Sequence, residues 1–210
     1  MSRALPEHLS LNLCRVQTAQ RAEVQAFISQ CFAEHYNARV EHFMPDLLAL
    51  CGPDGSLQGA LGLRFASQTP LFCEQYLYEP VEQLISHVQG EPTERAVLIE
   101  VGQLAAHDAG SARALIIHAT AYLAAQGLRY VVFTGTRQLR NSFARLGLRP
   151  QFLAQAEAAR LGAAGAAWGD YYSTTPQVMF GDIQLGDRQL RERGVYAALG
   201  LQCVPEMDCA

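Results

Sequence analysis

AVLIEVGQLAA at 96–106 decides the fold, together with HDAG at 107–110, SARALIIHATAYLAAQ at 111–126 and, after Gly127, YVVFT at 130–134. The first and last of these runs are apolar and rich in β-branched residues, which is typical of buried strands. Between them apolar residues recur at helical spacing, and glycine commonly follows the last turn of a helix. A helix between two buried strands predicts a crossover unit, with a ligand site at the carboxyl end of the first strand.

The start of the central helix carries small residues and backbone N–H groups that have no partner within a helix. Such a helix end has a partial positive charge and suits a pyrophosphate. Gly110, Ser111 and Ala112 would let a phosphate approach the backbone closely, and Arg113 adds a charge-assisted donor. Asp108 points to the opposite conclusion, because its carboxylate would cap the helix or repel a phosphate. The local pattern alone therefore favours an ordinary capped helix packed on a sheet.

The rest of the chain continues the mixture of strands and helices. Pro-Asp-Gly at 53–55 predicts the turn of a β-hairpin, and Gly59 and Gly62 in its second arm indicate a bulge or a close backbone approach. The other predicted elements are strands at 11–16, 46–51, 56–66 and 178–183, and helices at 18–35 (with Thr18 as N-cap), 80–88, 139–146 and 154–167. No linker or repeat divides the chain, so we expect one α/β domain over 1–210, in which 152–210 belong to the fold or form an extension or lid.

Composition excludes several classes of function. Half of the 210 residues are apolar and 17% are charged, which is sufficient for a packed core. No apolar run reaches the roughly 18 residues of a membrane span or forms the h-region of a secretory signal, so we expect a cytoplasmic protein without a membrane span. The six cysteines include no Cys-x-x-Cys pair and the histidines have no ligand spacing, so we expect no metal. A net charge of −4 argues against binding of nucleic acid.

Several motifs resemble those of known families. HDAGSA at 107–112 resembles a degenerate pyrophosphate loop of GNAT acyltransferases, and NSFARLGL at 141–148 resembles their segment beside the pantetheine arm. A longer resemblance, to the bacterial thermostable hemolysin family, rests on AEHYNA at 33–38, FMP at 43–45, EQYL at 74–77, IEVGQLA at 99–105, FTGT at 133–136 and WGDYY at 168–172. The layout is also similar to that of acyl-homoserine lactone synthases. These resemblances imply a GNAT-like mixed central sheet flanked by helices, with splayed central strands.

The resemblance implies an N-acyltransferase that moves an acyl group from CoA or from an acyl-phosphopantetheine on a carrier protein to an amine. Glu100, in an otherwise apolar strand, is either a solvent-facing or salt-bridged carboxylate or a buried one with a raised pKa, suited to general-base work. The resemblance favours the base. It also implies that the backbone of Gln103, Leu104 and Ala105 binds pantetheine amides. Asn141 is implied to flank the same arm, and a surface asparagine is the alternative.

The acceptor side is predicted from isolated polar residues and aromatic clusters. Glu74 would bind an acceptor ammonium or pair with Arg64, and the clustered aromatic residues would line a pocket or anchor the C-terminal segment. The resemblance favours the pocket. The residues assigned to it are Tyr36, Asn37, Arg64, Glu74, Trp168, Tyr171 and Tyr172.

An arginine-rich segment follows the second buried strand. Arg137, Arg140 and Arg145 would hold a CoA phosphate or dock an acidic acyl carrier protein, or they form a plain solvated face. Two other functions stay open. One is a membrane-active lytic protein, as the family's name suggests, and the other is a GNAT-fold binding module without catalysis.

Overall fold

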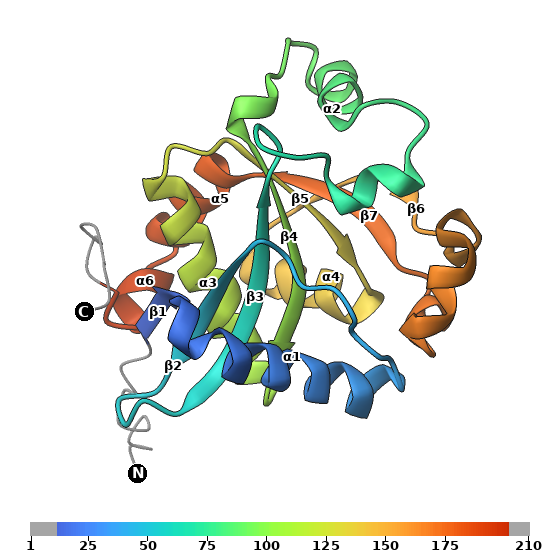
Figure 1. The fold of residues 1–210 in the computed structure, drawn as a ribbon. Coiled ribbons are helices and arrows are strands. Elements are labelled where there is room, and N and C mark those ends of the chain that lie inside the picture. Colours follow the sequence, from blue (N-terminus) through green and yellow to red (C-terminus); the bar gives the residue numbers. More distant parts are fainter. Residues whose placement is uncertain (1–11, 202–210) are drawn as a thin grey trace.

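A seven-stranded sheet in the order β1-β2-β3-β4-β5-β7-β6 forms the centre of this computed structural model, which describes residues 12–201 (Figure 1). β4 and β5 run parallel, and the other neighbouring strands run antiparallel. The two ends of the predicted domain, 1–11 and 202–210, lie outside the described residues. The strands are β1 (Asn12–Arg15), β2 (Asp46–Cys51), β3 (Leu57–Phe65), β4 (Leu98–Ala106), β5 (Tyr130–Gly135), β6 (Gln151–Gln155) and β7 (Gln177–Asp182).

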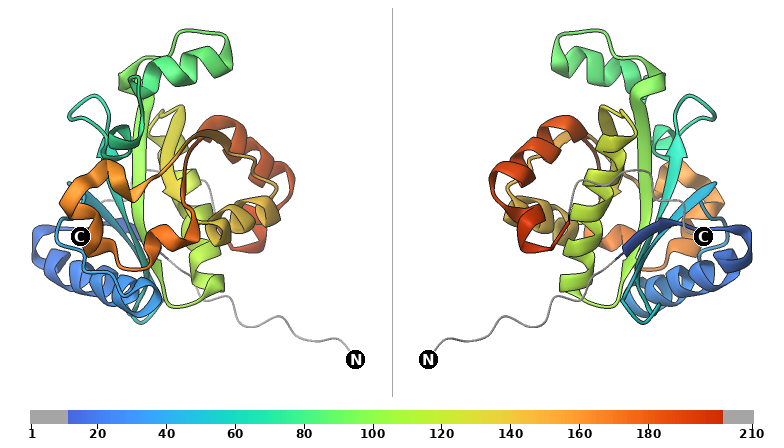
Figure 2. Two further views of the ribbon diagram at one scale, coloured as in Figure 1. Left: turned by 90° about the vertical axis from the view of Figure 1, so that its right-hand side faces the viewer. Right: turned by 90° about the vertical axis from the view of Figure 1, so that its left-hand side faces the viewer.

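Helices cover both faces of this sheet. The α-helices are α1 (Arg21–Tyr36), α2 (Val81–Gln89), α3 (Ala109–Ala125), α4 (Arg137–Leu146), α5 (Ile183–Glu192) and α6 (Val195–Ala198). The 3₁₀ turns are η1 (Thr18–Gln20), η2 (Phe72–Tyr76), η3 (Arg95–Val97), η4 (Ala158–Trp168) and η5 (Tyr171–Thr174). Figure 2 shows α1, η4 and η5 on one face and α3, α4 and α5 on the other. Among these described helices, none combines the length and the apolar character needed to cross a membrane.

Two predicted elements differ from the structure, and one observed helix was not predicted. Thr18 begins the turn η1 rather than capping α1, whose N-cap is Gln20. The predicted helix at 154–167 is wrong: its first residues finish β6, which pairs with β7, and the remainder is 3₁₀ turns interrupted at Gly162 (φ 55°). Helix propensity is a weak preference even for alanine, the strongest helix former, so strand pairing and a glycine override it. The helix α5 was not predicted, because few of its residues are apolar.

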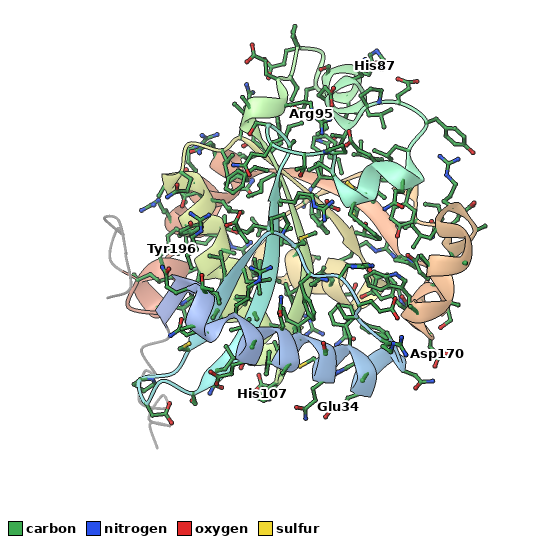
Figure 3. The ribbon with its side chains drawn as sticks, in the orientation of Figure 1. Glu34, His87, Arg95, His107, Asp170 and Tyr196 are labelled. Atoms are coloured by element: carbon green, nitrogen blue, oxygen red, sulfur yellow. The ribbon has the colours of Figure 1, made fainter. Side chains whose placement is uncertain are left out.

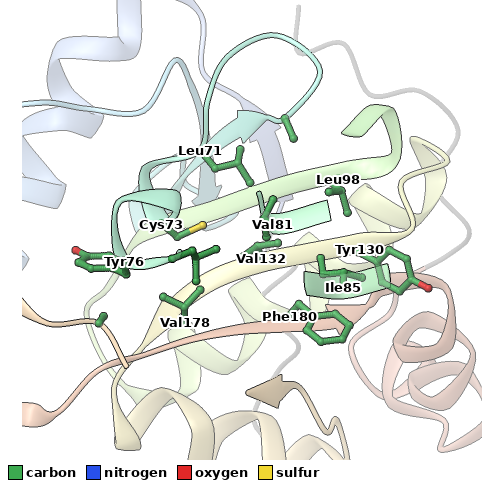
Figure 4. Close-up of a cluster of buried hydrophobic side chains, with 13 residues drawn as sticks. Leu71, Cys73, Tyr76, Val81, Ile85, Leu98, Tyr130, Val132, Val178 and Phe180 are labelled. Atoms are coloured by element: carbon green, nitrogen blue, oxygen red, sulfur yellow. The ribbon is translucent and has the colours of Figure 1, made fainter. Parts of the chain in front are cut away.

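The turn η2 packs over the middle of the sheet. Its Cys73 and Tyr76 join Leu98 of β4, Val132 of β5 and Val178 of β7 in one buried cluster (Figure 4). All five side chains are at most 3% exposed. Burial of this size contributes roughly 1.5–3 kcal/mol for each large apolar side chain. It therefore holds the start of η2 firmly against β4 and β5.

The two central strands separate after only three paired positions. β4 and β5 pair at Leu98↔Tyr130, Ile99↔Val131 and Glu100↔Val132. From there β4 continues beside β3 to Ala106, while β5 continues beside β7 to Gly135. Figure 1 shows the two arrows diverging toward their tips. The predicted splay of the central strands is confirmed.

Candidate active site

A cavity of about 480 Å³ lies where β4 and β5 diverge. One wall is the backbone and side chains of β4 from Glu100 to Ala106, and the other includes Phe133 and Thr134 of β5. Beyond Glu100 the β5-facing backbone groups of β4 have no partner in β5. An apolar pocket with a few polar groups converging on it is typical of a small-molecule site.

Glu100 lies at the fork of the splay, because it is the last residue of β4 that pairs with β5. Its side chain is 2% exposed and lines the cavity. The N–H groups of Phe72 and Cys73, at the start of η2, donate to its two oxygens at 2.6 and 2.9 Å. Burial raises the pKa of Glu100, while these two amides and the charge of Arg64 oppose the rise. A carboxylate that remains hydrogen-bonded yet has a raised pKa is suited to accept a proton.

Arg64 is the cross-strand neighbour of Glu100 in the antiparallel pairing of β3 with β4. Its Nη1 donates to the carbonyl of Pro70 at 3.3 Å, and its Nε is buried without a hydrogen-bond partner. The side chain lines the cavity. A buried guanidinium N–H without a partner is costly, and an anionic group of a ligand would satisfy it.

Glu74 does not line the cavity. Its carboxylate accepts from Arg95 at 2.6 and 3.1 Å and from the N–H of Leu71 at 2.7 Å. Of the two roles predicted for Glu74, the pair with Arg64 is wrong, because its guanidinium partner is Arg95. Burial alone would raise the pKa of Glu74, but Arg95 and the amides of Leu71 and Val81 more than offset this and lower it. Figure 3 shows Arg95 beside α2, at the opposite end of the molecule from His107.

Aromatic rings from four elements, α1, η2, η4 and η5, form one wall of the cavity, which we call the aromatic wall. Trp168 is its centre, with ring centroids 6.1 Å from Phe32, 5.9 Å from Phe72 and 5.4 Å from Tyr171. All its members line the cavity: Phe32 and Tyr36 of α1, Phe72 and Tyr76 of η2, and Trp168, Tyr171 and Tyr172. The hydroxyls of Tyr76 and Tyr172 share a hydrogen bond. Tyr76 and Tyr172 are 96 residues apart in the sequence, so this wall forms only in the fold.

Residues 37–45 connect α1 to β2 and cross this cavity; we call this segment the strap. Six consecutive strap residues, 39–44, line the cavity. Asn37 does not, because it ends α1 in the left-handed conformation (φ 50°) and its N–H donates to Ala33. No function was predicted for residues 39–44 from their sequence. The irregular aromatic run at 43–45 was the only signal.

Backbone N–H groups at the start of α3 already have a hydrogen-bond partner, a carboxylate of the same chain. Asp108 accepts from the N–H groups of Gly110 at 2.6 Å and Ser111 at 2.8 Å. The amides of Ser111 and Gly110 lower its pKa, so a full negative charge stands at this helix end. Ala112 lines the cavity, while Gly110, Ser111 and the exposed Arg113 do not. A phosphate here would have to displace Asp108 or overcome its charge.

The cavity continues as an apolar branch between the sheet, α3 and α5. On α3 it is lined by Ala112, Ile116, Ala119, Thr120 and Leu123, which share one helical face. On α5, Ile183 and Gly186 line the same space. A Cβ added at Gly186 would lie 3.3 Å from Cδ2 of Leu148 and 3.7 Å from Cγ2 of Thr120, so the absence of a side chain keeps this end open.

The surface of α4 is polar and basic. Arg137, Asn141 and Arg145 are exposed, and Asn141 does not line the cavity, unlike its helix neighbours Gln138 and Ser142. Arg140 is half-buried, and its Nη1 donates to Gln177 at 2.5 Å. Within residues 12–201 no group of three or more His, Cys, Asp or Glu side chains is arranged to hold a metal ion.

A comparison with known families identifies the group to which the protein belongs. The profile of the thermostable hemolysin family matches residues 14–187. This chain belongs to the thermostable hemolysin family. No curated protein sequence matches it.

Solved structures show the fold of this hemolysin-family chain. A CoA-dependent acyl-homoserine lactone synthase, MesI, is similar at 12% identity and a TM-score of 0.57, over 91% of this chain and 96% of that one. FeeM, an N-acyl amino acid synthase from uncultured soil microbes, is similar at 14% identity and 0.55, over 87% and 97%. A putative N-acetyltransferase from Lactobacillus plantarum is similar at 14% and 0.51, over 82% and 98%. Such identities show the fold alone, and the predicted GNAT-like architecture is confirmed.

The structure brings together only part of the predicted site of this family member. The residues that line one cavity are Tyr36, Arg64, Glu100, Gln103, Leu104, Ala105, Ala112, Trp168, Tyr171 and Tyr172. Asn37, Glu74, Gly110, Ser111, Arg113 and Asn141 lie outside it. We call the part of the cavity between the diverging strands β4 and β5 the slot. Thr134 was quoted only as part of a motif, yet its hydroxyl, buried at this slot, has no hydrogen-bond partner.

Proposed function

We propose that this protein is an N-acyltransferase in which Glu100 is the general base. The observation that carries the proposal is the position of Glu100 at the fork of the splay, where the slot beside β4 meets the aromatic wall. The similar folds of acyl-homoserine lactone synthases and an N-acyl amino acid synthase support it.

The reaction would join an amine to an acyl thioester. The amine nitrogen attacks the thioester carbonyl carbon, an amide bond forms, and the C–S bond breaks. Glu100 takes the proton lost by the amine, directly or through a water. It then returns this proton to the departing sulfur, which leaves as a thiol, and the carboxylate is regenerated. Each oxygen of Glu100 keeps a lone pair beside its bond to η2, so it can accept this proton. Unpaired backbone N–H groups of β4 would stabilise the carbonyl oxygen.

The acceptor we propose is an α-amino acid or a molecule that contains one. Arg64 would bind its carboxylate through the unpartnered Nε, while the neighbouring Glu100 faces its amine. The aromatic wall would then contact the apolar remainder of the acceptor. One guanidinium and one carboxylate on adjacent strands match the two charged groups of an amino acid.

The donor we propose is an acyl-phosphopantetheine on a carrier protein. The carboxylate of Asp108 occupies the amides that would otherwise bind the pyrophosphate of CoA. The exposed Arg137 and Arg145 on α4 give an acidic carrier a basic surface to approach. The apolar branch along α3 would receive the acyl chain, because its lining is aliphatic over three helical turns.

The test is a direct assay with purified protein. Acyl-carrier protein and acyl-CoA would each be offered with α-amino acids and with the matching amines that lack the carboxylate, and products would be identified by mass spectrometry. We expect N-acyl amino acids, formed faster from the carrier protein. No product and no thermal shift with any thioester would exclude the proposal. Leakage from liposomes that persists in Glu100→Gln would instead indicate a membrane-active protein.

A further inference from the structure

Gln103 has a backbone conformation that residues other than glycine rarely adopt. Its φ is 53°, in the left-handed region, although it lies inside β4. The register passes from Gly62↔Gly102 to Ala60↔Ala105, so two residues of β4 lie opposite one residue of β3 and form a β-bulge. A non-glycine residue stays in this region only when its surroundings hold it there, and such strain gathers at functional sites.

The side chain of Gln103 is held by the strap. Its Oε1 accepts from the N–H of Met44 at 3.0 Å, and its Nε2 donates to the carbonyl of His42 at 2.7 Å. The amide therefore bonds the strap with both its donor and its acceptor group. The bulge and the strap, 59 residues apart in sequence, are thereby joined at one residue.

The strap fits closely against the sheet beside these bonds. Met44 packs on the paired glycines of β3 and β4: a Cβ at Gly62 would lie 2.7 Å from its Cβ, and one at Gly102 would lie 2.5 Å from its Cε. Arg21 of α1 donates to the carbonyls of Met44 at 2.7 Å and Pro45 at 2.8 Å. The strap therefore has a defined seat, and Gln103 lies next to it.

The other end of the strap is bonded to the segment that carries the aromatic wall. The N–H of Arg39 donates to the carbonyl of Ala167 at 2.7 Å, and the N–H of Asp170 donates to that of Tyr36 at 2.7 Å. Trp168 lies between these two bonds. A continuous chain of contacts thus runs from the bulge in the slot, through Gln103 and the strap, to the aromatic wall.

We propose that Gln103 is a positioning residue that sets the acceptor side of the site relative to the donor slot. Its backbone forms the slot wall on which the thioester would lie, and its side chain fixes the strap that encloses the acceptor. The assignment of a donor side and an acceptor side rests on the proposed function. The two hydrogen bonds between Gln103 and the strap, which we call the clamp, are a property of the folded chain. Removal of the side chain should loosen acceptor binding and leave donor binding and the chemical step largely unchanged.

The first measurement needs no substrate. Hydrogen exchange of residues 38–45 is compared between wild type, Gln103→Met and Gln103→Gly. Glycine accepts the positive φ, so the second variant keeps the bulge if the first folds poorly. Gln184→Met is the matched control, since Gln184 also makes two side-chain bonds, to the carbonyls of Ala124 and Leu128 on the other face. We expect the amide of Met44 to exchange at least about tenfold faster in both Gln103 variants and to be unchanged in the control.

The second measurement separates the kinetic constants of the proposed transfer. In Gln103→Gly, KM for the acceptor should rise about tenfold, which corresponds to the loss of one or two neutral hydrogen bonds. KM for the donor and kcat should stay within about threefold, as should all constants of Gln184→Met. Unchanged strap exchange in both variants overturns the proposal, whether or not the protein transfers acyl groups. Faster exchange with an unchanged acceptor KM also overturns it. Absence of turnover in wild type counts against the proposed function instead, and the exchange data still decide whether the clamp exists.

Discussion

Glu74 and Glu100 are two glutamates in apolar sequence segments whose pKa values shift in opposite directions. Glu74 is paired with Arg95, and its pKa is lowered. Glu100 is held by two backbone N–H groups at the fork of β4 and β5, and its pKa is raised. A guanidinium in contact neutralises a carboxylate and makes it part of the framework. At Glu100, burial outweighs these two amides and the charge of Arg64, so the pKa stays raised. We therefore assign Glu100 to the proposed chemistry and Glu74 to the scaffold.

The largest effect should come from the glutamate at the fork. Glu100→Gln keeps the shape of the side chain and removes the base, so kcat should fall about 10²–10⁴-fold. In wild type, kcat/KM should decline as pH drops through the raised pKa of Glu100, because the base must be ionised. The variant should lose this acid limb. Rates from pH 4.5 to 8.5 check both expectations, and a variant with more than about a tenth of wild-type activity would contradict them.

The matched change in the scaffold should affect stability instead. Glu74→Gln keeps the bond from the Leu71 amide and loses the charge opposite Arg95. We expect a loss of about 2 kcal/mol in the free energy of unfolding, since hydrogen bonds between charged groups are worth roughly 1.5–3 kcal/mol. Activity per folded molecule should stay within about threefold of wild type. Urea denaturation and initial rates measured on the same sample distinguish this from a role in binding.

Glu82→Gln is the control for Glu74→Gln. It removes the second carboxylate on Arg95, at 2.7 Å, and leaves the pair with Glu74. Its cost should be smaller, because Glu74 alone still neutralises the guanidinium. A large loss of activity in Glu74→Gln with unchanged stability would reverse the assignment and return Glu74 to the acceptor site.

The framework followed from sequence because its signals are local. β2 was predicted at its observed bounds, and the apolar runs around Glu100 and Val132 predicted the parallel pair. The resemblance then implied their splay. The start of α3 was placed two residues late. The residues after Asp108 could be interpreted as a phosphate-binding turn or as the first turn of a helix capped by Asp108.

The site was only half visible because tertiary contacts select it. Nothing local distinguishes Glu74 from Glu100, since both lie in apolar segments; the difference is Arg95, which the chain brings to one of them. Gln103 was assigned through its backbone, and its side-chain bonds to the strap depend on a loop far away in sequence. Polar roles that depend on a distant partner are therefore the ones that sequence patterns miss.

The apolar branch of the cavity, unlike Glu100, should determine which acyl-chain lengths are accepted rather than the rate of the chemical step. Gly186→Leu places a side chain where a Cβ already approaches Leu148 and Thr120, so it should fill the end of the branch. We expect kcat/KM to fall about tenfold for long acyl chains and to change little for short ones. A series of acyl thioesters of increasing length measures this. Ala125→Leu, on the exposed end of α3, is the control. An equal loss at every length would contradict a role in length selection.

His118 is buried like Glu100 but lies outside the cavity. It is 6% exposed, and burial lowers its pKa from 6.5 to about 4. The unfolded chain therefore binds a proton at a higher pH than the folded one. The contribution of His118 to stability is therefore present above about pH 6.5 and declines as pH falls toward 4.

Because His118 is buried away from the cavity, it should make the stability of the fold sensitive to acid and should not affect the reaction. Between about pH 7.5 and 5.5, the contribution of His118 to the loss of unfolding free energy should be about 1 kcal/mol. His118→Leu should remove that increment, whereas His87→Leu, at an exposed position, should keep it. Urea denaturation of the three proteins at both pH values measures the difference. An unchanged pH dependence in His118→Leu would mean that the folded protein accommodates the imidazolium. Burial would then not determine the pKa of His118. The raised pKa of Glu100 would have to be established separately, from the pH–rate profile.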